Sequence, residues 1–405
     1  MAASKTGLPE LHPVSGFRLG SASAGIKSMG RLDLVVMELA PASTCAAMFT
    51  RNAFCAAPVV VAREHLGNAV PAYLLVNTGN ANAGTGDQGM HDALQCCSDL
   101  AELAACSAAA ILPFSTGVIG EPLPVDRIRS GLPAAMDNLA EDGWATAATG
   151  ILTTDTRPKG SSRQVEIDGH TITVTGIAKG AGMIRPDMAT MLAFIATDAR
   201  VSSDSLQSCL STAVGKSFNR ITVDGDTSTN DACVLVATGK TALPEINTAD
   251  EPYRIFSAAV REVCVELAQA IVRDGEGATR FVTVSVEGGR DTEECLQVAY
   301  TIAHSPLVKT ALFAGDPNWG RILAAVGRAG VKDLDLQAIE IYLDDVCIVR
   351  DGGRAADYTE AAGQQVMDQP EMTIRVVLGR GDYNEQVWTC DLSYDYVRIN
   401  AEYRT

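Results

Sequence analysis

Residues that could bind an anion or react are concentrated in GIAKGAGMIRPDMATMLAFIATDA, residues 176–199. Lys179 and Arg185 bring two cations to an otherwise acidic chain, and the glycines between them allow close backbone approach. An apolar run that contains Thr190 follows at once. By itself this pattern is typical of a Gly-rich turn that leads into a buried element, with Thr190 as a β-branched core residue.

Two further short stretches could serve an active site. In PFSTGVIG, residues 113–120, the successive backbone N–H groups around Thr116 and Gly117 could cradle an anion. In RDGEGATRF, residues 273–281, Glu276 stands between glycines after an expected helix. The ordinary interpretations are a turn for the first stretch and a helix C-cap with an exposed acid for the second.

Three motif matches fail when their full patterns are tested. Residues 84–89 fit G-x-G-x-x-G, but the expected strand ends near Asn77, too early for a dinucleotide loop. Residues 215–217 resemble the end of a P-loop whose first glycine is absent. The polar run 224–231 lacks the EF-hand Gly and Glu, so it indicates a loop with Asx-type turns or a support for an active site.

The elements that would position these residues alternate between strands and helices. A strand at 69–77 enters the Gly-rich loop 77–89. A helix follows over 90–106, and its expected apolar face has Leu94, Cys97, Ala101 and Ala104. A hairpin is predicted at 164–175 around Asp168-Gly169. The remaining elements are helices near 203–217 and 252–272, a strand at 281–286, and a helix opened by Asp316 as N-cap with Pro317 at N1. This interleaving predicts an α/β or α+β fold.

Composition and charge exclude several classes of partner. The 405 residues include 49 acidic and 32 basic side chains, a formal net charge of −17, without the cation cluster that nucleic acid or an anionic membrane surface requires. The eleven cysteines show no paired spacing for a disulfide framework or a metal site. No signal peptide or 18-residue apolar run is present, so we expect a cytoplasmic protein without a metal.

Several strings together resemble the ornithine acetyltransferase family, the bifunctional glutamate N-acetyltransferases of arginine biosynthesis. They cover nearly the whole chain, and the most specific of them is the KGAGMIxPxMATML pattern. The chain departs from many members at Gly84, where those members have Cys. The strings are NTGNANAGTG, PFSTGVIG, ILTTDTRPK, KGAGMIRPDMATMLAFIATDA, TVDGDTSTND, VRDGEGATRF, AGDPNWGRI and RINAEYRT.

The resemblance implies that the chain cuts itself between Ala189 and Thr190. Thr190 would then be the catalytic nucleophile at the start of a new fragment, with its own α-amine as general base. Fragments 1–189 and 190–405 would be co-folded and not independent domains, in a sandwich of layered helices around mixed β-sheets like that of the N-terminal-nucleophile enzymes. The resemblance also implies an assembly of two copies of each fragment.

The resemblance further implies a site and a reaction. The backbone at Thr116 and Gly117 would form the oxyanion hole. Thr190 would take acetyl from N-acetylornithine and pass it to glutamate in a ping-pong reaction without a cofactor; acetyl-CoA, used by part of the family, would be a second donor substrate. By charge, Lys179 suits an α-carboxylate and Glu276 the amine of ornithine. The implied substrate contacts are Thr153, Lys179, Thr190, Glu276, Asn400 and Thr405.

Two rival interpretations stay open at this point. A self-processing amidase or aminopeptidase would use the same nucleophile with water as the acceptor. An acidic ligand-binding protein without enzymatic activity would have the same glycine-rich strings as ordinary turns.

Overall fold

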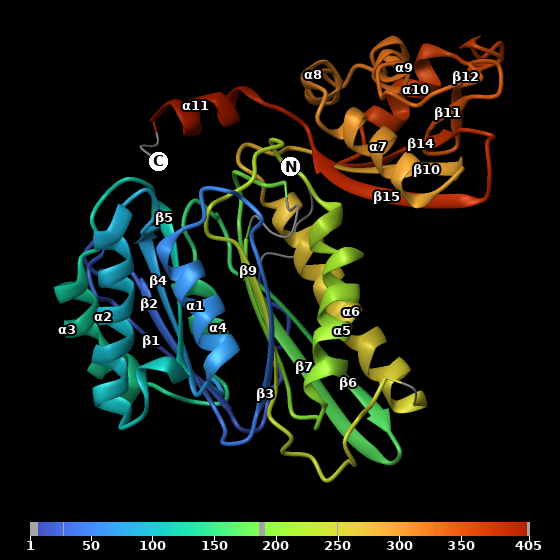
Figure 1. Cartoon of the computed structure of the whole chain (residues 1–405). Helices are drawn as coiled ribbons and strands as arrows, with labels where there is room; N and C mark the ends of the chain where they lie inside the picture. Colours follow the sequence, from blue (N-terminus) through green and yellow to red (C-terminus); the bar gives the residue numbers. More distant parts are fainter. Residues whose placement is uncertain (1–6, 27, 186–190, 249, 403–405) are drawn as a thin grey trace. The chain divides into compact units, whose positions relative to one another are not determined.

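The computed structural model describes residues 7–26, 28–185, 191–248 and 250–402 (Figure 1). These residues form two compact units. The larger unit contains residues up to 219 together with 226–271, and the smaller unit contains 220–225 together with 272–402. Each unit has its own sheets and core, and each is described separately.

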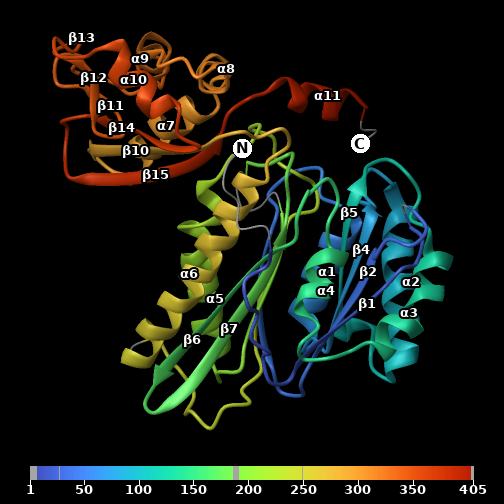
Figure 2. The same cartoon turned by 180° about the vertical axis from the view of Figure 1, so that it is seen from behind.

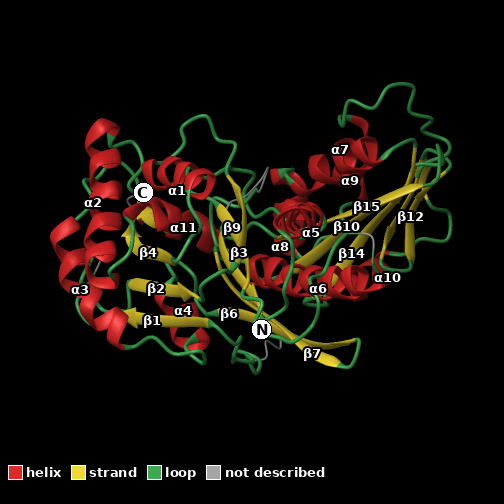
Figure 3. Ribbon diagram, turned by 60° about the horizontal axis from the view of Figure 1, so that its bottom comes forward, coloured by secondary structure: helices red, strands yellow, loops and turns green. Residues whose placement is uncertain are grey.

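One sheet of the larger unit has four strands in the order β1-β2-β4-β5. These are β1 (Phe17–Ala22), β2 (Leu34–Leu39), β4 (Tyr73–Asn80) and β5 (Ile111–Val118), and only the β4–β5 pair is parallel. Helices α2 (Gly86–Ala104) and α3 (Val125–Asp137) pack on one face through a core that includes Leu34, Cys97 and Leu132. Figure 3 shows these two helices beside the sheet.

The second sheet of the larger unit has five strands in the order β3-β9-β8-β7-β6. Its strands are β3 (Thr44–Phe49), β6 (Lys159–Ile167), β7 (His170–Lys179), β8 (Leu192–Thr197) and β9 (Ala232–Ala237). Helices α5 (Ser203–Gly215) and α6 (Glu251–Arg273) lie along its outer face (Figure 2). Gly176 permits the close approach of α6, because a Cβ there would lie 3.1 Å from Leu267 Cδ1.

The inner faces of the two sheets share one core. Phe114 of β5 and Phe194 of β8 meet edge to face, with their ring centroids 5.2 Å apart. Helices α1 (Ala57–Asn68) and α4 (Trp144–Gly150) contribute Ala62 and Trp144 to the same core. The larger unit is therefore a helix–sheet–sheet–helix sandwich, and the predicted mixed α/β class with layered helices is confirmed.

The smaller unit is built on a six-stranded sheet in the order β13-β12-β11-β14-β10-β15. Its core joins Val284, Ile302, Ile341 and Ile374 to the helices that cover the sheet. The strands are β10 (Phe281–Gly289), β11 (Glu340–Leu343), β12 (Val346–Arg350), β13 (Gly353–Arg354), β14 (Glu371–Val377) and β15 (Tyr383–Cys390). The helices are α7 (Thr292–Ala303), α8 (Pro306–Ala314), α9 (Trp319–Gly327), α10 (Glu360–Met367) and α11 (Tyr394–Glu402).

The predicted cleavage position falls in residues 186–190, so Ala189 and Thr190 lie outside the described residues. The strands on either side of it are neighbours: β7 and β8 pair antiparallel, with Lys179 opposite Leu192. The five-stranded sheet thus takes strands from both sides of the expected cut, while the four-stranded sheet lies wholly before it. In the described part of the chain, no helix combines the length and the apolarity needed to span a bilayer.

Most predicted elements are present, with two corrections. The hairpin at Asp168-Gly169 is confirmed, and both residues have the positive φ that a type I′ turn requires. On the face of α2 expected to be buried, Cys97 and Ala101 are buried, but Leu94 is 45% exposed, and Leu100 is buried in its place. The N-cap of α9 is not Asp316 but Asn318, whose side chain accepts a hydrogen bond from the Arg321 N–H.

Candidate active site

Gly117, at the end of β5, occupies a place that only glycine can fill. Its φ is +140°, and a Cβ there would lie 2.3 Å from the carbonyl carbon of Gly79 and 2.5 Å from the nitrogen of Asn80. Both contacts are to backbone atoms of β4, which cannot move to make room as the end of a flexible side chain could. The predicted oxyanion residues, Thr116 and Gly117, are thus pressed against the end of the neighbouring parallel strand.

Thr116 and Gly117 belong to strand β5, not to the turn that the stretch 113–120 suggested, and hydrogen bonds on both sides hold this strand end. The Ser115 hydroxyl donates to Asn77 Oδ1 at 2.6 Å, and the Ala81 N–H donates to the carbonyl of Val118 at 2.9 Å. These bonds tie the residue before 116–117 to β4 itself and the residue after them to the Gly-rich loop that follows β4. A fixed backbone is what an oxyanion hole requires, because its donors must point at the position where charge develops in the transition state.

Lys179 links the end of β5 to the strands that flank the expected nucleophile. It is the last residue of β7, it is 9% exposed, and its Nζ donates to Thr116 Oγ1 at 3.2 Å. Its backbone pairs with Leu192, two residues after Thr190 along the chain. The structure therefore brings together the predicted residues Lys179 and Thr116, from elements about 60 residues apart in sequence, at the end of the strand pair that encloses the cleavage segment.

Asp155 is a buried acid that the sequence interpretation did not select. Its side chain is fully buried and accepts hydrogen bonds from Lys159 Nζ at 2.6 Å and from the Gly180 N–H at 2.6 Å. It also accepts from the N–H of the predicted substrate residue Thr153 at 3.0 Å. Burial alone would raise the pKa of Asp155, but the charges of Lys159 and Lys179 and these hydrogen bonds outweigh it and hold the pKa below its usual range.

The anion of Asp155 thus fixes Thr153 and the residue after Lys179 at once. Arg31 supports the same loop, since its Nη2 donates to the Thr153 carbonyl at 3.0 Å. The available sequence signal was the spacing of Asp155 and Lys159 within ILTTDTRPK, one of the strings that carry the family resemblance. That spacing alone does not reveal the contact with Gly180, which is 25 residues away.

Replacing Asp155 with Asn is expected to lower the free energy of unfolding at pH 7 by about 3–5 kcal/mol, because Lys159 stays buried without its counter-ion. The folded pKa of Asp155 lies below its unfolded value, so the carboxylate stabilises the fold above the unfolded pKa. This contribution is lost as the pH falls through the folded pKa, so the difference between wild type and variant should shrink in acid.

Urea unfolding at pH 7 and at a series of values below pH 4 measures this difference. Asp168→Asn is the matched control, because Asp168 is exposed at a hairpin turn and its φ of +49° suits Asn. Equal destabilisation of the two variants, or a difference that grows in acid, would contradict the role of the Asp155 charge.

In the smaller unit, Glu276 and Asn400 contact each other. Glu276 lies in the turn after α6 with only 8% of its surface exposed, and its Oε2 accepts from Asn400 Nδ2 of α11 at 2.8 Å. Gly277 allows this approach, because a Cβ there would lie 2.5 Å from the Tyr396 nitrogen. Two predicted substrate residues are thus paired, and Thr405, the third C-terminal prediction, lies outside the described residues.

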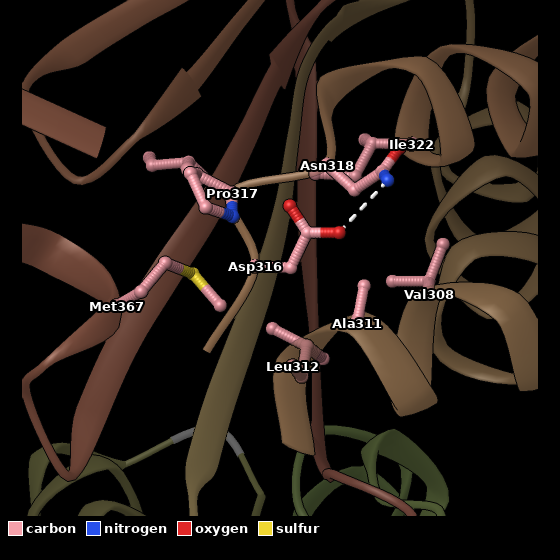
Figure 4. Close-up of a pocket in the computed structure, with 9 residues that line it drawn as sticks. Val308, Ala311, Leu312, Asp316, Pro317, Asn318, Ile322 and Met367 are labelled. Carbon is pink, nitrogen blue, oxygen red and sulfur yellow. Dashed lines mark hydrogen bonds between the residues drawn. The ribbon is translucent and has the colours of Figure 1, made fainter. Parts of the chain in front are cut away.

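A small, mostly apolar cavity of about 10 Å³ lies in the smaller unit (Figure 4). Two polar side chains line it, and they bind each other: the Asp316 carboxylate accepts a hydrogen bond from Asn318 Nδ2 at 3.0 Å. None of the predicted site residues that the structure describes lines this cavity. Its lining residues are Val308, Ala311, Leu312, Asp316, Pro317, Asn318, Ile322, Leu343 and Met367.

Gly84, the position at which the family resemblance leads us to expect Cys, borders an open cavity of about 500 Å³ in the larger unit. A Cβ at Gly84 would lie 3.7 Å from Ile119 Cγ2 and 3.7 Å from the Phe54 ring, which are ordinary contact distances. The departure therefore changes the wall of that cavity and leaves the backbone at Thr116 and Gly117 untouched.

Comparison with known proteins assigns this chain to a family. The model of the ArgJ family matches residues 18–405. The arginine biosynthesis bifunctional protein ArgJ of Pseudomonas fluorescens (strain Pf0-1) is 64% identical over 406 residues, which cover all of both chains. The crystal structure of the bifunctional protein from Bacillus halodurans is 39% identical with a TM-score of 0.51, covering 53% of this chain and all of that one.

A further solved structure is ornithine acetyltransferase from Mycobacterium tuberculosis complexed with ornithine. It is 32% identical with a TM-score of 0.39, covering 44% of this chain and 94% of that one. The match to the family model over residues 18–405 and the full-length match to the Pseudomonas protein decide the assignment. The chain therefore belongs to the ArgJ family, and its predicted place among the acetyltransferases of arginine biosynthesis is confirmed.

Proposed function

We propose that this chain cuts itself at Ala189-Thr190 and transfers acetyl from N-acetylornithine to glutamate through an acetyl-Thr190 intermediate. The observation that carries the proposal is the contact of Lys179 with Thr116 at the end of the β7–β8 pair, which unites a cation, the tightly packed end of β5 and the strand after Thr190. The family match supports the reaction class.

The proposed transfer has two matched halves. In the first, the α-amine of Thr190 takes the proton of its own hydroxyl, and Oγ bonds to the acetyl carbon while the backbone N–H groups at 116–117 receive the developing oxyanion. The C–N bond of N-acetylornithine then breaks, and the proton passes to the departing amine. Glutamate's amine reverses these steps, so one amide replaces another and no ATP is required.

Charge supports an amino-acid substrate for this site. Lys159 and Lys179 both lie close enough to the buried Asp155 carboxylate to lower its pKa, so two cationic side chains stand at this site. We assign Lys179 to the substrate α-carboxylate and Glu276 to the amine of ornithine. Thr153, Asn400 and Thr405 are the other proposed contacts.

The remaining family expectations are proposed together with the reaction. Two copies of each fragment form the assembly, the protein works in the cytoplasm, and no cofactor takes part. Acetyl-CoA is proposed only as a second donor substrate, to be tested by its ability to acetylate glutamate in the absence of N-acetylornithine.

Ornithine release from N-acetylornithine, measured with and without glutamate, tests the proposal. We expect steady release only when glutamate is present, and without glutamate a single burst no larger than the amount of enzyme. Steady release that does not depend on glutamate would identify water as the acceptor and favour the amidase alternative. No release under either condition would contradict both enzymatic functions.

A further inference from the structure

Asn230 makes contacts that no described side chain of the proposed site duplicates. It lies in the polar run before β9, and it is 6% exposed. Its Nδ2 donates to the carbonyl of Ser115 at 3.0 Å and to the carbonyl of Ala81 at 2.5 Å. One buried amide therefore bridges the residue before the proposed oxyanion residues, Thr116 and Gly117, and the Gly-rich loop that follows β4.

The same run is tied to the ends of the cleavage segment. Ala232, two residues after Asn230, donates its N–H to the carbonyl of Met191 at 3.0 Å, and it pairs with Leu192 in the parallel β8–β9 ladder. Thr227 Oγ1 donates to the carbonyl of Arg185 at 3.3 Å. Met191 follows Thr190 directly, so Asn230 is separated from the expected nucleophile by one strand pairing and one peptide bond.

We propose that Asn230 is a positioning residue that sets the oxyanion donors relative to Thr190, an inference that rests on the proposed acetyl transfer. In a trans peptide the C=O and N–H groups point in opposite directions. Because Asn230 holds the Ser115 carbonyl, it also fixes the direction of the Thr116 N–H. The hydrogen bond from the Ala232 N–H to the Met191 carbonyl then links the segment that carries Asn230 to β8, the strand that begins two residues after Thr190.

The chemistry of the contacts requires an amide at this position. Two carbonyls accept from the same nitrogen, which an amide can satisfy with its two N–H groups. The Asn230 Oδ1 accepts from the Thr229 hydroxyl at 2.6 Å, so the other end of the side chain is held as well. An aspartate of the same shape would lose both donors and would face the two carbonyls with negative charge.

The test compares Asn230→Ala and Asn230→Asp with Thr238→Val, in the purified full-length protein. Thr238 is buried just beyond the other end of β9, and its hydroxyl donates to the Ser15 carbonyl at 2.6 Å. Thr238→Val therefore removes a comparable hydrogen bond at the end of β9 away from Asn230. Acetyl transfer, measured per cleaved chain, should lose about 100-fold in kcat in both Asn230 variants, since a small misplacement of reacting groups has this effect. KM should stay near wild type.

Thr238→Val should keep the wild-type kcat even though its unfolding midpoint falls. An Asn230 variant that is folded but stays uncut supports the same conclusion, because the same hydroxyl attacks in both reactions. Wild-type kcat in both Asn230 variants, or a fall in kcat matched by Thr238→Val, would overturn the positioning role. If the wild-type protein transfers no acetyl, the proposed function itself fails, which is a distinct result.

Discussion

Thr190→Ala is expected to leave the chain uncut and without acetyl transfer. The variant lacks the hydroxyl that would attack the Ala189 carbonyl, and because no new N-terminus forms, it also lacks the amine proposed as general base. Denaturing electrophoresis should show one chain of 405 residues instead of fragments 1–189 and 190–405. Transfer from N-acetylornithine to glutamate should fall to background.

Thr190→Ser is the matched variant, since it keeps a hydroxyl and, once cut, a free α-amine. It should be cleaved and should retain measurable transfer, which separates the loss of the nucleophile from the loss of the side chain's volume. Full activity of Thr190→Ala, cut or uncut, would remove Thr190 from its proposed role.

Gly117→Ala should give the second largest loss. The new Cβ cannot fit 2.3 Å from the Gly79 carbonyl carbon, so the backbone at the end of β5 must move. The φ of +140° is also strained for alanine. Displacing one oxyanion donor lowers kcat by about 10²–10³-fold in other acyl-transfer enzymes. We expect a loss of this size in the steady-state rate of the purified variant, with little change in KM.

Gly120→Ala is the control for this variant. Gly120 also has a positive φ, +82°, but a Cβ there would meet no atom within 4 Å. It should lose stability, about 1 kcal/mol or somewhat more from backbone strain, and keep most of its kcat. If Gly117→Ala were as active as Gly120→Ala, the close packing of β5 against β4 would have no catalytic meaning.

Local patterns in the sequence predicted the elements that depend on short-range chemistry. The hairpin at 164–175 follows from strand alternation around Asp168-Gly169, and α5 and α6 follow from apolar residues at helical spacing. The predicted burial of Cys97 and Ala101 in α2 is confirmed, but that of Leu94 was wrong, because helical spacing fits more than one choice of face and tertiary packing buried Leu100 instead.

The residues of the candidate site also fall into those that the sequence indicated and those that it did not. Family resemblance pointed to Lys179 and Thr116, and the structure shows the contact between them. Asp155 and Asn230 were not selected, because their decisive partners are distant in sequence: 25 residues separate Asp155 from Gly180, and 115 separate Asn230 from Ser115. Composition or periodicity could not reveal these contacts, since each depends on how separate strand ends come together.

The mass of the fragment that begins at Thr190 is the most direct measurement of the proposed intermediate. The enzyme is mixed with N-acetylornithine in the absence of glutamate, quenched in acid and analysed by mass spectrometry with fragmentation. We predict one added acetyl group located on Thr190, which disappears when glutamate is supplied before the quench. Efficient acetyl transfer by a chain that remains uncut, or that carries no acetyl on Thr190 under these conditions, would contradict the mechanism.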